Sequence, residues 1–284
     1  MLVSPYICPV CALPLESQLN SLRCAAQHSF DRHKKGYINL LLAQNKNSKA
    51  PGDDALMVQS RRRFLEAGHY QTLADRISAQ MAERLPTDAR LWDAGCGEGY
   101  YTQTIAQANP AFDCYGLDIS KPAIVAASKY KNIHWSVASS THAPYADTSF
   151  DAIVSVFSRV DSEPFHRVLK SGGAVCMVTP DFDHLLALRQ LIYQDVRPYD
   201  VSKHQSYLDD RFELVHDERL TFELDLPTNQ AIFDLLGMTP HAHRLSHEAQ
   251  DRLKQTPALQ DRACFKLYWL VKKPATDAFV NQAP

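Results

Sequence analysis

The sequence has no long hydrophobic run. None of its apolar stretches approaches the roughly 20 residues that a membrane-spanning helix requires. The N-terminal stretch MLVSPYICPVCALPL also lacks the basic flank and unbroken apolar core of a secretory signal. These two absences predict a protein of the cytoplasm that has no membrane partner.

A disulfide framework is missing as well. Seven cysteines are an odd number, and they are spread over a long chain, which is typical of a reducing compartment. Three of them, Cys8, Cys11 and Cys24, lie close together and need another explanation. The other four lie in apolar or glycine-rich contexts and are expected to be small core residues: Cys96, Cys114, Cys176 and Cys264.

The chain also lacks an excess of charge of one sign. Its formal net charge is −2, which argues against a uniformly basic nucleic-acid binder. The charge is polarised, however, because residues 1–70 hold nine basic against five acidic residues and the rest of the chain is acidic. Such a chain can bind a polyanion through one face, although a merely solvated basic surface is an equal alternative. The basic cluster comprises Arg32, His33, Lys34, Lys35, Lys46, Lys49 and Arg61–Arg63.

Composition and periodicity divide the chain into four parts. Residues 1–45 are rich in Cys and His, show no helical period, and would need a metal to fold. Residues 46–85 hold a polar linker with Pro51-Gly52 and two amphipathic helices, the first capped by Asp53 or Asp54. Residues 86–274 alternate strands and helices, include a long helix at 183–193, and end in antiparallel strands, while 275–284 form a tail. The pattern predicts an α/β fold whose mostly parallel sheet carries helices on both faces.

A glycine-rich turn follows the first strand of this α/β region. Asp93 precedes Gly95, Gly97 and Gly99, and a helix follows. Glycine is needed where the backbone turns sharply or a ligand approaches closely. The spacing G-x-G-x-G is tighter than the G-x-G-x-x-G that seats a pyrophosphate in dinucleotide enzymes. Asp-x-Gly-x-Gly-x-Gly resembles the signature of class I methyltransferases, in which the glycines seat the amino-acid end of S-adenosylmethionine.

The end of the next strand carries Asp118. A carboxylate there can accept both ribose hydroxyls of a nucleoside. Its alternative role is a helix N-cap, which Ser120 could perform itself. The third strand ends without the acidic residue that contacts adenine in many class I methyltransferases, so Ser139 or backbone groups would have to do so.

The N-terminal cysteines have the spacing of a metal site. Cys8, Cys11, Cys24 and His28 form C-x2-C-x12-C-x3-H, and two ligand pairs about a dozen residues apart match a tetrahedral structural Zn²⁺ site. Three thiolates and one imidazole leave no position for water, so the metal is expected to be structural. The alternative is core cysteines beside an incidental histidine.

The motifs CPVC, HSFDRHKKGYINLL, PGDD, RRRFLEAGHY and WDAGCGEGYYT, in this order, resemble the 23S ribosomal RNA guanine-N1 methyltransferase family. The resemblance runs from Cys8 to DLLGMTP near residue 240. It implies methylation by S-adenosylmethionine of a guanine, number 745 in the branch that the chain resembles more, within a hairpin loop of 23S rRNA. It also implies a homodimer that forms a cleft for the RNA. The family's cofactor positions fall on Tyr70, Gly97, Glu98 and His184.

The chemistry leaves further roles open. Guanine N1 carries a proton at neutral pH, so a general base or a stabiliser of charge at O6 is expected. Base candidates are Asp181, Asp183 and His184, and Arg159 could stabilise O6. The base must leave its stack, and Phe157 or Tyr101 could receive it. Arg32, Lys34, Lys35 and Arg61–Arg63 are candidates for phosphate contacts.

Two other functions remain open. A small-molecule methyltransferase would have the same fold but would need neither the metal module nor the basic cluster. A non-catalytic zinc RNA-binding protein would keep the module on a decayed scaffold. The complete Asp93–Gly99 turn and Asp118 argue against decay, and cofactor binding would decide.

Overall fold

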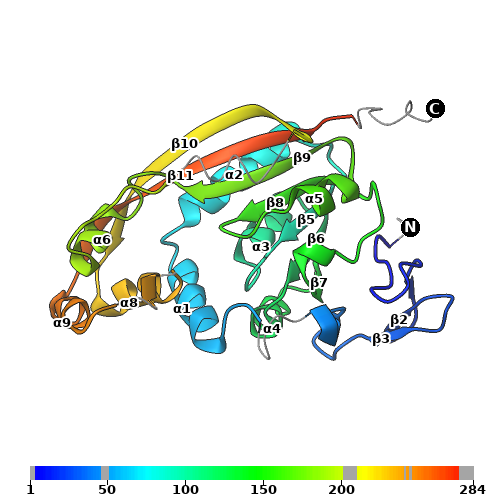
Figure 1. Ribbon diagram of the computed structural model, residues 1–284, viewed down its shortest axis with the longest axis horizontal. Helices are drawn as coiled ribbons and strands as arrows, with labels where there is room; N and C mark the ends of the chain where they lie inside the picture. Colours follow the sequence, from blue (N-terminus) through cyan, green and yellow to red (C-terminus); the bar gives the residue numbers. More distant parts are fainter. Residues whose placement is uncertain (1–3, 46–50, 201–209, 240, 243–244, 275–284) are drawn as a thin grey trace, which may run out of the picture.

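A mixed sheet of eight strands forms the centre of the molecule (Figure 1). The computed structural model describes residues 4–45, 51–200, 210–239, 241–242 and 245–274. The predicted tail at 275–284 lies outside these residues. The strand order is β10-β11-β9-β8-β5-β6-β7-β4. The strands are β4 Ile38–Asn39, β5 Arg90–Ala94, β6 Asp113–Asp118, β7 His134–Val137, β8 Phe150–Val156, β9 Leu169–Pro180, β10 Phe212–Leu226 and β11 Leu259–Lys272.

The sheet is parallel from β4 to β9 and antiparallel at its β11 and β10 edge. This arrangement confirms the predicted α/β class with antiparallel strands at the C-terminus. The α-helices that surround the sheet are α1 Ala55–Glu66, α2 Gln71–Arg84, α3 Tyr100–Ala108, α4 Lys121–Ala127, α5 Ser162–Val168, α6 Leu186–Ile192, α8 Asn229–Gly237 and α9 His247–Gln255. In the described part of the chain no helix is long and apolar enough to cross a membrane.

Alternating residues of the strands face two different cores. On β5, Leu91 belongs to the core beneath α2 and α3, whereas Trp92 belongs to the core on the opposite face. The second core is covered by α5 together with apolar residues of the N-terminal module, residues 1–45, such as Tyr6 and Leu22. A period of two residues per strand produces this division. Helices and module together therefore shield the two faces of the sheet.

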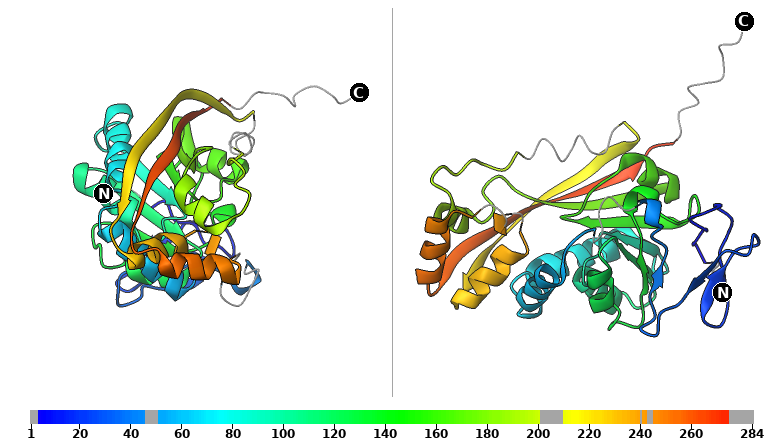
Figure 2. Two further views of the ribbon diagram at one scale, coloured as in Figure 1. Left: turned by 90° about the vertical axis from the view of Figure 1, so that its left-hand side faces the viewer. Right: turned by 60° about the horizontal axis from the view of Figure 1, so that its bottom comes forward.

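The N-terminal module is joined to the rest of the molecule through the main sheet. Its own antiparallel sheet consists of β1 Glu16–Ser17, β2 Ser21–Arg23 and β3 Ser29–Asp31. The following strand β4 pairs in parallel with β7, so that Ile38 lies opposite Ser136. Tyr6 forms a bridge to Tyr145, and the module lies at the opposite end of the molecule from α8 and α9 (Figure 2).

Local side-chain caps mark where four of the described helices begin, namely α1, α4, α8 and α9, and one helix prediction was wrong. Asp54 caps α1 by accepting backbone hydrogen bonds from Leu56 and Met57 at 2.8 and 2.9 Å. The long helix expected at 183–193 is only α6, seven residues long. It begins late because the carboxylate of Asp261, on β11, accepts the backbone N–H groups of Ala187 and Leu188. A residue distant in sequence supplies the cap, and no local pattern could indicate it.

Candidate metal centre and active-site cavity

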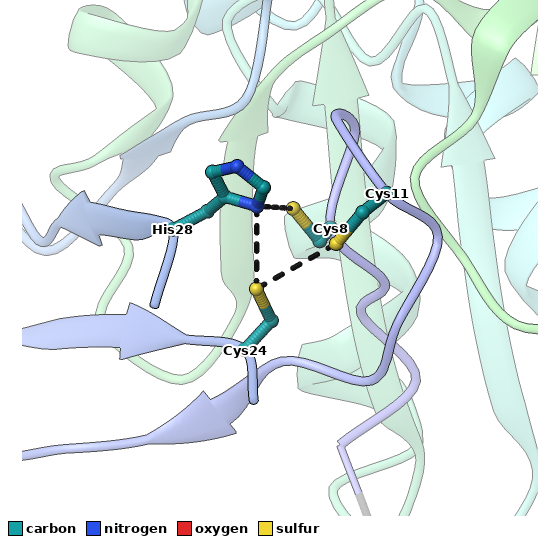
Figure 3. Close-up of side chains that lie close together, drawn as sticks. All are labelled: Cys8, Cys11, Cys24 and His28. Atoms are coloured by element: carbon teal, nitrogen blue, oxygen red, sulfur yellow. Dashed lines mark hydrogen bonds between the residues drawn. The ribbon is translucent and has the colours of Figure 1, made fainter. Parts of the chain in front are cut away.

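The four predicted metal ligands meet in one cluster (Figure 3). Their ligand atoms all lie within 4.8 Å of one another. His28 Nδ1 is 3.6 Å from Cys8 Sγ and 3.5 Å from Cys24 Sγ, and Cys11 Sγ is 3.7 Å from Cys24 Sγ. Tetrahedral bonds of about 2.3 Å to sulfur and about 2.0 Å to nitrogen would place sulfurs about 3.8 Å apart and sulfur about 3.5 Å from nitrogen. The cluster therefore has the dimensions of a four-coordinate metal site.

Two tight backbone turns present these ligands. In the first, the backbone N–H of Ala12 donates to the carbonyl of Cys8 at 2.8 Å. In the second, the N–H of Gln27 donates to the carbonyl of Cys24 at 2.9 Å. Both Ala12 and Gln27 have positive φ angles, of 57° and 66°. The turns direct two pairs of side chains to one point, and all four positions of a tetrahedron are filled by protein.

A large cavity lies at the carboxyl ends of the parallel strands. Its volume is about 1630 Å³, and this edge is where open α/β sheets bind their ligands. Predicted site residues that line it are Tyr70, Asp93, Gly95, Gly97, Glu98, Asp118 and His184, together with Tyr101, Ser139, Phe157 and Arg159. Gly99, Asp181 and Asp183 are not among its lining residues.

The three glycines of the turn serve different purposes. A Cβ at Gly95 would lie 2.5 Å from the Cβ of Ser158, and one at Gly99 would lie 2.6 Å from Trp135. Close packing within the protein therefore requires these two glycines. A Cβ at Gly97 would instead meet the guanidinium of Arg61 at the cavity. Of the three, Gly97 is the one placed to let a ligand approach the backbone.

Asp118 is held at the tip of β6 by backbone hydrogen bonds. Its Oδ2 accepts from Gly97 N at 2.9 Å, and its Oδ1 accepts from Ser120 N at 2.7 Å. Ser120 caps α4 itself, which leaves the second lone pair of each Asp118 oxygen for a ligand. Burial raises the pKa of Asp118, and the two backbone donors oppose that shift. The geometry fits a pair of ribose hydroxyls.

Asp93 is buried beneath the glycine turn. Thr102 donates a hydrogen bond from Oγ1 to its Oδ2 at 2.5 Å, which ties α3 to β5. Burial raises the pKa of Asp93 to about 7. The side chain of Asp93 thus fixes the start of α3, which follows the turn, although the residue also lines the cavity.

Arg61 points into the cavity from α1. Its Nε donates to Glu98 at 2.5 Å, and it also forms an ion pair with Asp53. Burial opposes the charge of Arg61, but the two carboxylates raise its pKa. Because both carboxylates engage its side chain at the cavity, the structure does not support the expectation that Arg61 contacts RNA phosphates. Gly52 and Asp53, expected in an exposed linker, pack against Ile119 and Ser120 and form the cavity rim.

The two other arginines of the run are also paired. Arg62 contacts Glu66 at 2.9 Å, and Arg63 forms a fork with Asp234 that joins α1 to α8. In contrast, Lys34 and Lys35 are exposed on the N-terminal module. Of the residues predicted to contact phosphate, those on the module are therefore better placed to do so than the three arginines.

Tyr70 and His184 lie next to each other in the cavity lining. The Tyr70 hydroxyl is 3.5 Å from His184 Nε2. His184 Nδ1 accepts the backbone N–H of Cys264 at 3.1 Å, so the proton of the neutral ring belongs on Nε2. Burial lowers the pKa of His184 to about 3. The ring is suited to donate a hydrogen bond, and this arrangement does not support its role as a base.

The carboxylates of Asp181 and Asp183 are directed to a different partner. Both form ion pairs with Arg219 on β10, at 2.5 and 2.7 Å. Each is paired with this arginine, outside the cavity lining. The structure therefore gives no support to the expectation that either one removes the guanine proton.

Several lining residues were not predicted. Tyr193, Tyr199 and His241 form one wall of the cavity, and Asp53 and Arg61 another. The motif PGDD followed by RRRFLE is the sequence signal that could have indicated Arg61. In the structure, this segment places a cation and an acidic residue beside the glycine turn. Nothing in the local pattern around the two tyrosines and His241 distinguishes them from ordinary surface residues.

Comparisons with known proteins agree with both parts of this site. A zinc ribbon family described as "RlmA, N-terminal" matches residues 6–49, and a methyltransferase domain family matches residues 92–173. The crystal structure of a "putative methyltransferase" from Bacillus halodurans superposes with a TM-score of 0.50 at 14% identity, covering 69% of this chain and 99% of that one. Fold and cavity thus define a class I methyltransferase.

Curated relatives specify the family. "Putative 23S rRNA (guanine-N(1)-)-methyltransferase YxjB" of Bacillus subtilis is 32% identical over 271 residues, 89% of this chain and 92% of that protein. The "23S rRNA (guanine(748)-N(1))-methyltransferase" of Streptomyces fradiae is 30% identical over 260 residues, 89% and 91% of the two chains. The chain belongs to the 23S rRNA guanine-N1 methyltransferase family, as the sequence motifs indicated.

Proposed function

We propose that the protein transfers a methyl group from S-adenosylmethionine to N1 of a guanine in 23S rRNA. The observation that carries this proposal is the cavity at the carboxyl ends of the strands, where Gly97 and Asp118 meet. Its volume of about 1630 Å³ exceeds the roughly 300–1,000 Å³ of an ordinary small-ligand site. The cavity can accommodate a cofactor and a nucleotide together.

The cofactor would be held along the glycine turn. Asp118 would accept the ribose hydroxyls, and Arg61 beside Gly97 would bind the carboxylate of the amino-acid end. When bound, S-adenosylmethionine supplies an electrophilic methyl group, so the protein has mainly to align the acceptor and exclude water. Tyr70 and His184 contact each other in the cavity lining and would position the reacting groups.

The metal cluster would hold a structural Zn²⁺. All four ligand positions come from Cys8, Cys11, Cys24 and His28, so there is no open position for catalysis. We infer that the metal stabilises the module as an RNA-binding surface, with Lys34 and Lys35 contacting phosphates. Because its substrate is ribosomal RNA, we expect the enzyme to act in the cytoplasm.

We further infer a homodimer, as the family resemblance implied. Strand β10 lies at the edge of the main sheet, and its Leu214 and Val215 are 44% and 49% exposed. Exposed apolar residues on an edge strand favour contact with a second copy. Sedimentation equilibrium would test this inference, and a monomer at micromolar concentration would contradict it.

Methylation of ribosomal RNA tests the proposed function directly. Purified protein, labelled S-adenosylmethionine and unmodified 23S rRNA are expected to give labelled RNA and one new reverse-transcriptase stop, since a methyl group on N1 blocks base pairing. The stop is expected at guanine 745, whereas guanine 748 would indicate the specificity named for the Streptomyces relative. A metabolite extract is the matched alternative substrate. Label in a small molecule, with none in RNA, would overturn the proposal.

A further inference from the structure

The cavity extends well beyond the seat of the cofactor. One end is formed by Gly97 and Asp118, and the other by residues of the segment after α6 and the segment after α8, namely Tyr193, Tyr199 and His241. A ligand seated on the glycine turn would leave this second end free. The second end holds no residue assigned to cofactor or metal.

A row of aromatic rings connects the two ends. Successive ring centroids are 4.6–6.3 Å apart. The row runs through Phe157, Phe265, His184, Tyr199, His241 and Tyr193. Phe265 is buried, and the other members of the row line the cavity. Aromatic rings in a cavity provide stacking surfaces for a nucleobase, each stacked base contributing about 1–3 kcal/mol to affinity.

The backbone at the start of this row is strained. Phe157 has φ of 54°, and Leu185, which also lines the cavity, has φ of 53°. Non-glycine residues rarely adopt this left-handed conformation, and when they do they cluster at ligand sites. The strained backbone of Phe157 accompanies a ring that is 45% exposed at the cavity. An apolar ring kept in contact with solvent at this point is suited to receive a planar ligand.

The far end of the row presents polar groups. Tyr193 Oη lies 2.8 Å from His241 Nδ1, and Tyr199 Oη lies 2.8 Å from His241 Nε2. A neutral imidazole donates through one nitrogen and accepts through the other. One tyrosine hydroxyl therefore accepts from the ring and keeps its own proton to donate. Guanine O6 is an acceptor that becomes more negative as N1 loses its proton, so such a donor stabilises it.

We propose that the part of the cavity between Phe157 and this second end is the pocket for the target guanine, with Phe157 as stacking surface and the Tyr193–His241–Tyr199 cluster as hydrogen-bond donor to O6. The inference rests on the proposed function, since the base enters only if RNA is the substrate. It assigns recognition of the base to one wall of the cavity. Cofactor binding stays with the glycine turn and Asp118.

The test measures how much the target base contributes to the affinity of the protein for RNA. The probe is the 23S rRNA hairpin that the wild-type enzyme methylates, with either guanine or an abasic site at the target position, bound in the presence of S-adenosylhomocysteine. The pocket variant combines Phe157→Leu, Tyr193→Phe and Tyr199→Phe. The matched control combines Phe182→Leu and Tyr100→Phe, residues outside the cavity lining.

Wild type and control are expected to bind the guanine hairpin about tenfold more tightly than the abasic hairpin. In the pocket variant this ratio is expected to fall to about one. An unchanged ratio in the variant would overturn the inference, even if the enzyme methylates guanine normally. Failure of the wild type to methylate any RNA would instead refute the proposed function, and the inference with it.

A folding defect is checked with the cofactor. Calorimetry is expected to show wild-type affinity of the pocket variant for S-adenosylmethionine, because none of the changed side chains hydrogen-bonds to Gly97 or Asp118. If the pocket variant has lost that affinity, two single variants are tested in its place, Tyr193→Phe and Tyr199→Phe. Each of them removes one oxygen atom. At least one is expected to lower the single-turnover methylation rate by about tenfold while cofactor affinity is kept. Two unchanged rates would contradict the donor role.

Discussion

The metal cluster and the cavity are built in opposite ways. The four ligands of the cluster come from 21 consecutive positions, Cys8 to His28, and two local turns direct them to one point. The cavity takes its lining from Gln44 to His241, with contributions from β5, β6, β8 and β9 and from α1. A site formed by local turns is visible in residue spacing. A site formed by tertiary contacts is not, and only its glycine turn and Asp118 could be recognised from the residue pattern.

The same contrast separates two sets of basic residues. Lys34 and Lys35 are exposed on the module, whereas Arg61, close to them in sequence, is enclosed by Glu98 and Asp53. Sequence proximity suggested one phosphate-binding surface. The structure instead places Lys34 and Lys35 on the module and Arg61 at the cavity. Four predictions test how far the metal module and the cavity are independent of each other.

The largest effect is expected from removal of zinc. A strong chelator should unfold the N-terminal module and weaken RNA binding by at least about 100-fold, because the roughly 10–16 kcal/mol of zinc binding is also folding free energy. Cofactor affinity, measured by calorimetry, should change by less than about threefold. An equal loss of cofactor affinity would show that the two sites fold as one unit.

Asp118→Ala is expected to weaken cofactor binding by about 100-fold, since hydrogen bonds to a charged group contribute about 1.5–3 kcal/mol each. Binding of RNA by the module should be unaffected. The matched control is Asp113→Ala, at the other end of β6, where the carboxylate pairs with Arg90 outside the cavity. Equal cofactor affinity in the two variants would contradict the assignment of Asp118.

A third pair of variants separates the basic residues. Arg61→Ala should lower cofactor affinity by about 10-fold or more, because it removes a charged donor and leaves Glu98 buried without its partner. Replacement of Lys34 and Lys35 by Ala should leave cofactor affinity unchanged but reduce the salt slope of RNA binding by about 2. A shallower salt slope in Arg61→Ala would show that this residue does contact phosphate.

The smallest effect concerns pH. His184 has a pKa of about 3 in the folded protein and about 6.5 in the unfolded chain. The unfolded chain therefore binds the extra proton between these values, and the free energy of unfolding falls as pH decreases, by about 1.4 kcal/mol per pH unit. Between pH 6.5 and pH 4.5, the free energy of unfolding of His184→Gln, measured in urea, should fall by about 2 kcal/mol less than that of the wild type. His33→Gln, at an exposed position, is the control, and identical pH profiles would refute burial of a neutral His184.

The sequence allowed the fold to be predicted because alternating apolar strands and amphipathic helices have distinct periods. The metal ligands, Gly97 and Asp118 could likewise be found, since each lies in a short motif at a strand end or turn. The length of α6 could not, because its cap is Asp261 on a distant strand. The wall formed by Tyr193, Tyr199 and His241 could not be predicted for the same reason, because these residues come from two segments far apart in the sequence and meet only in the folded protein.

Strand β4 sets the relation between the two sites. It belongs to the N-terminal module, yet it extends the main sheet beside β7, whose neighbour β6 ends at Asp118. The metal cluster and the cavity are therefore fixed to one continuous hydrogen-bonded framework. An RNA hairpin gripped by the module would present its loop to the cavity at a constant distance and rotation. Methylation would therefore depend on the length of the RNA stem. One added base pair would shift the target nucleotide away from the entrance of the cavity.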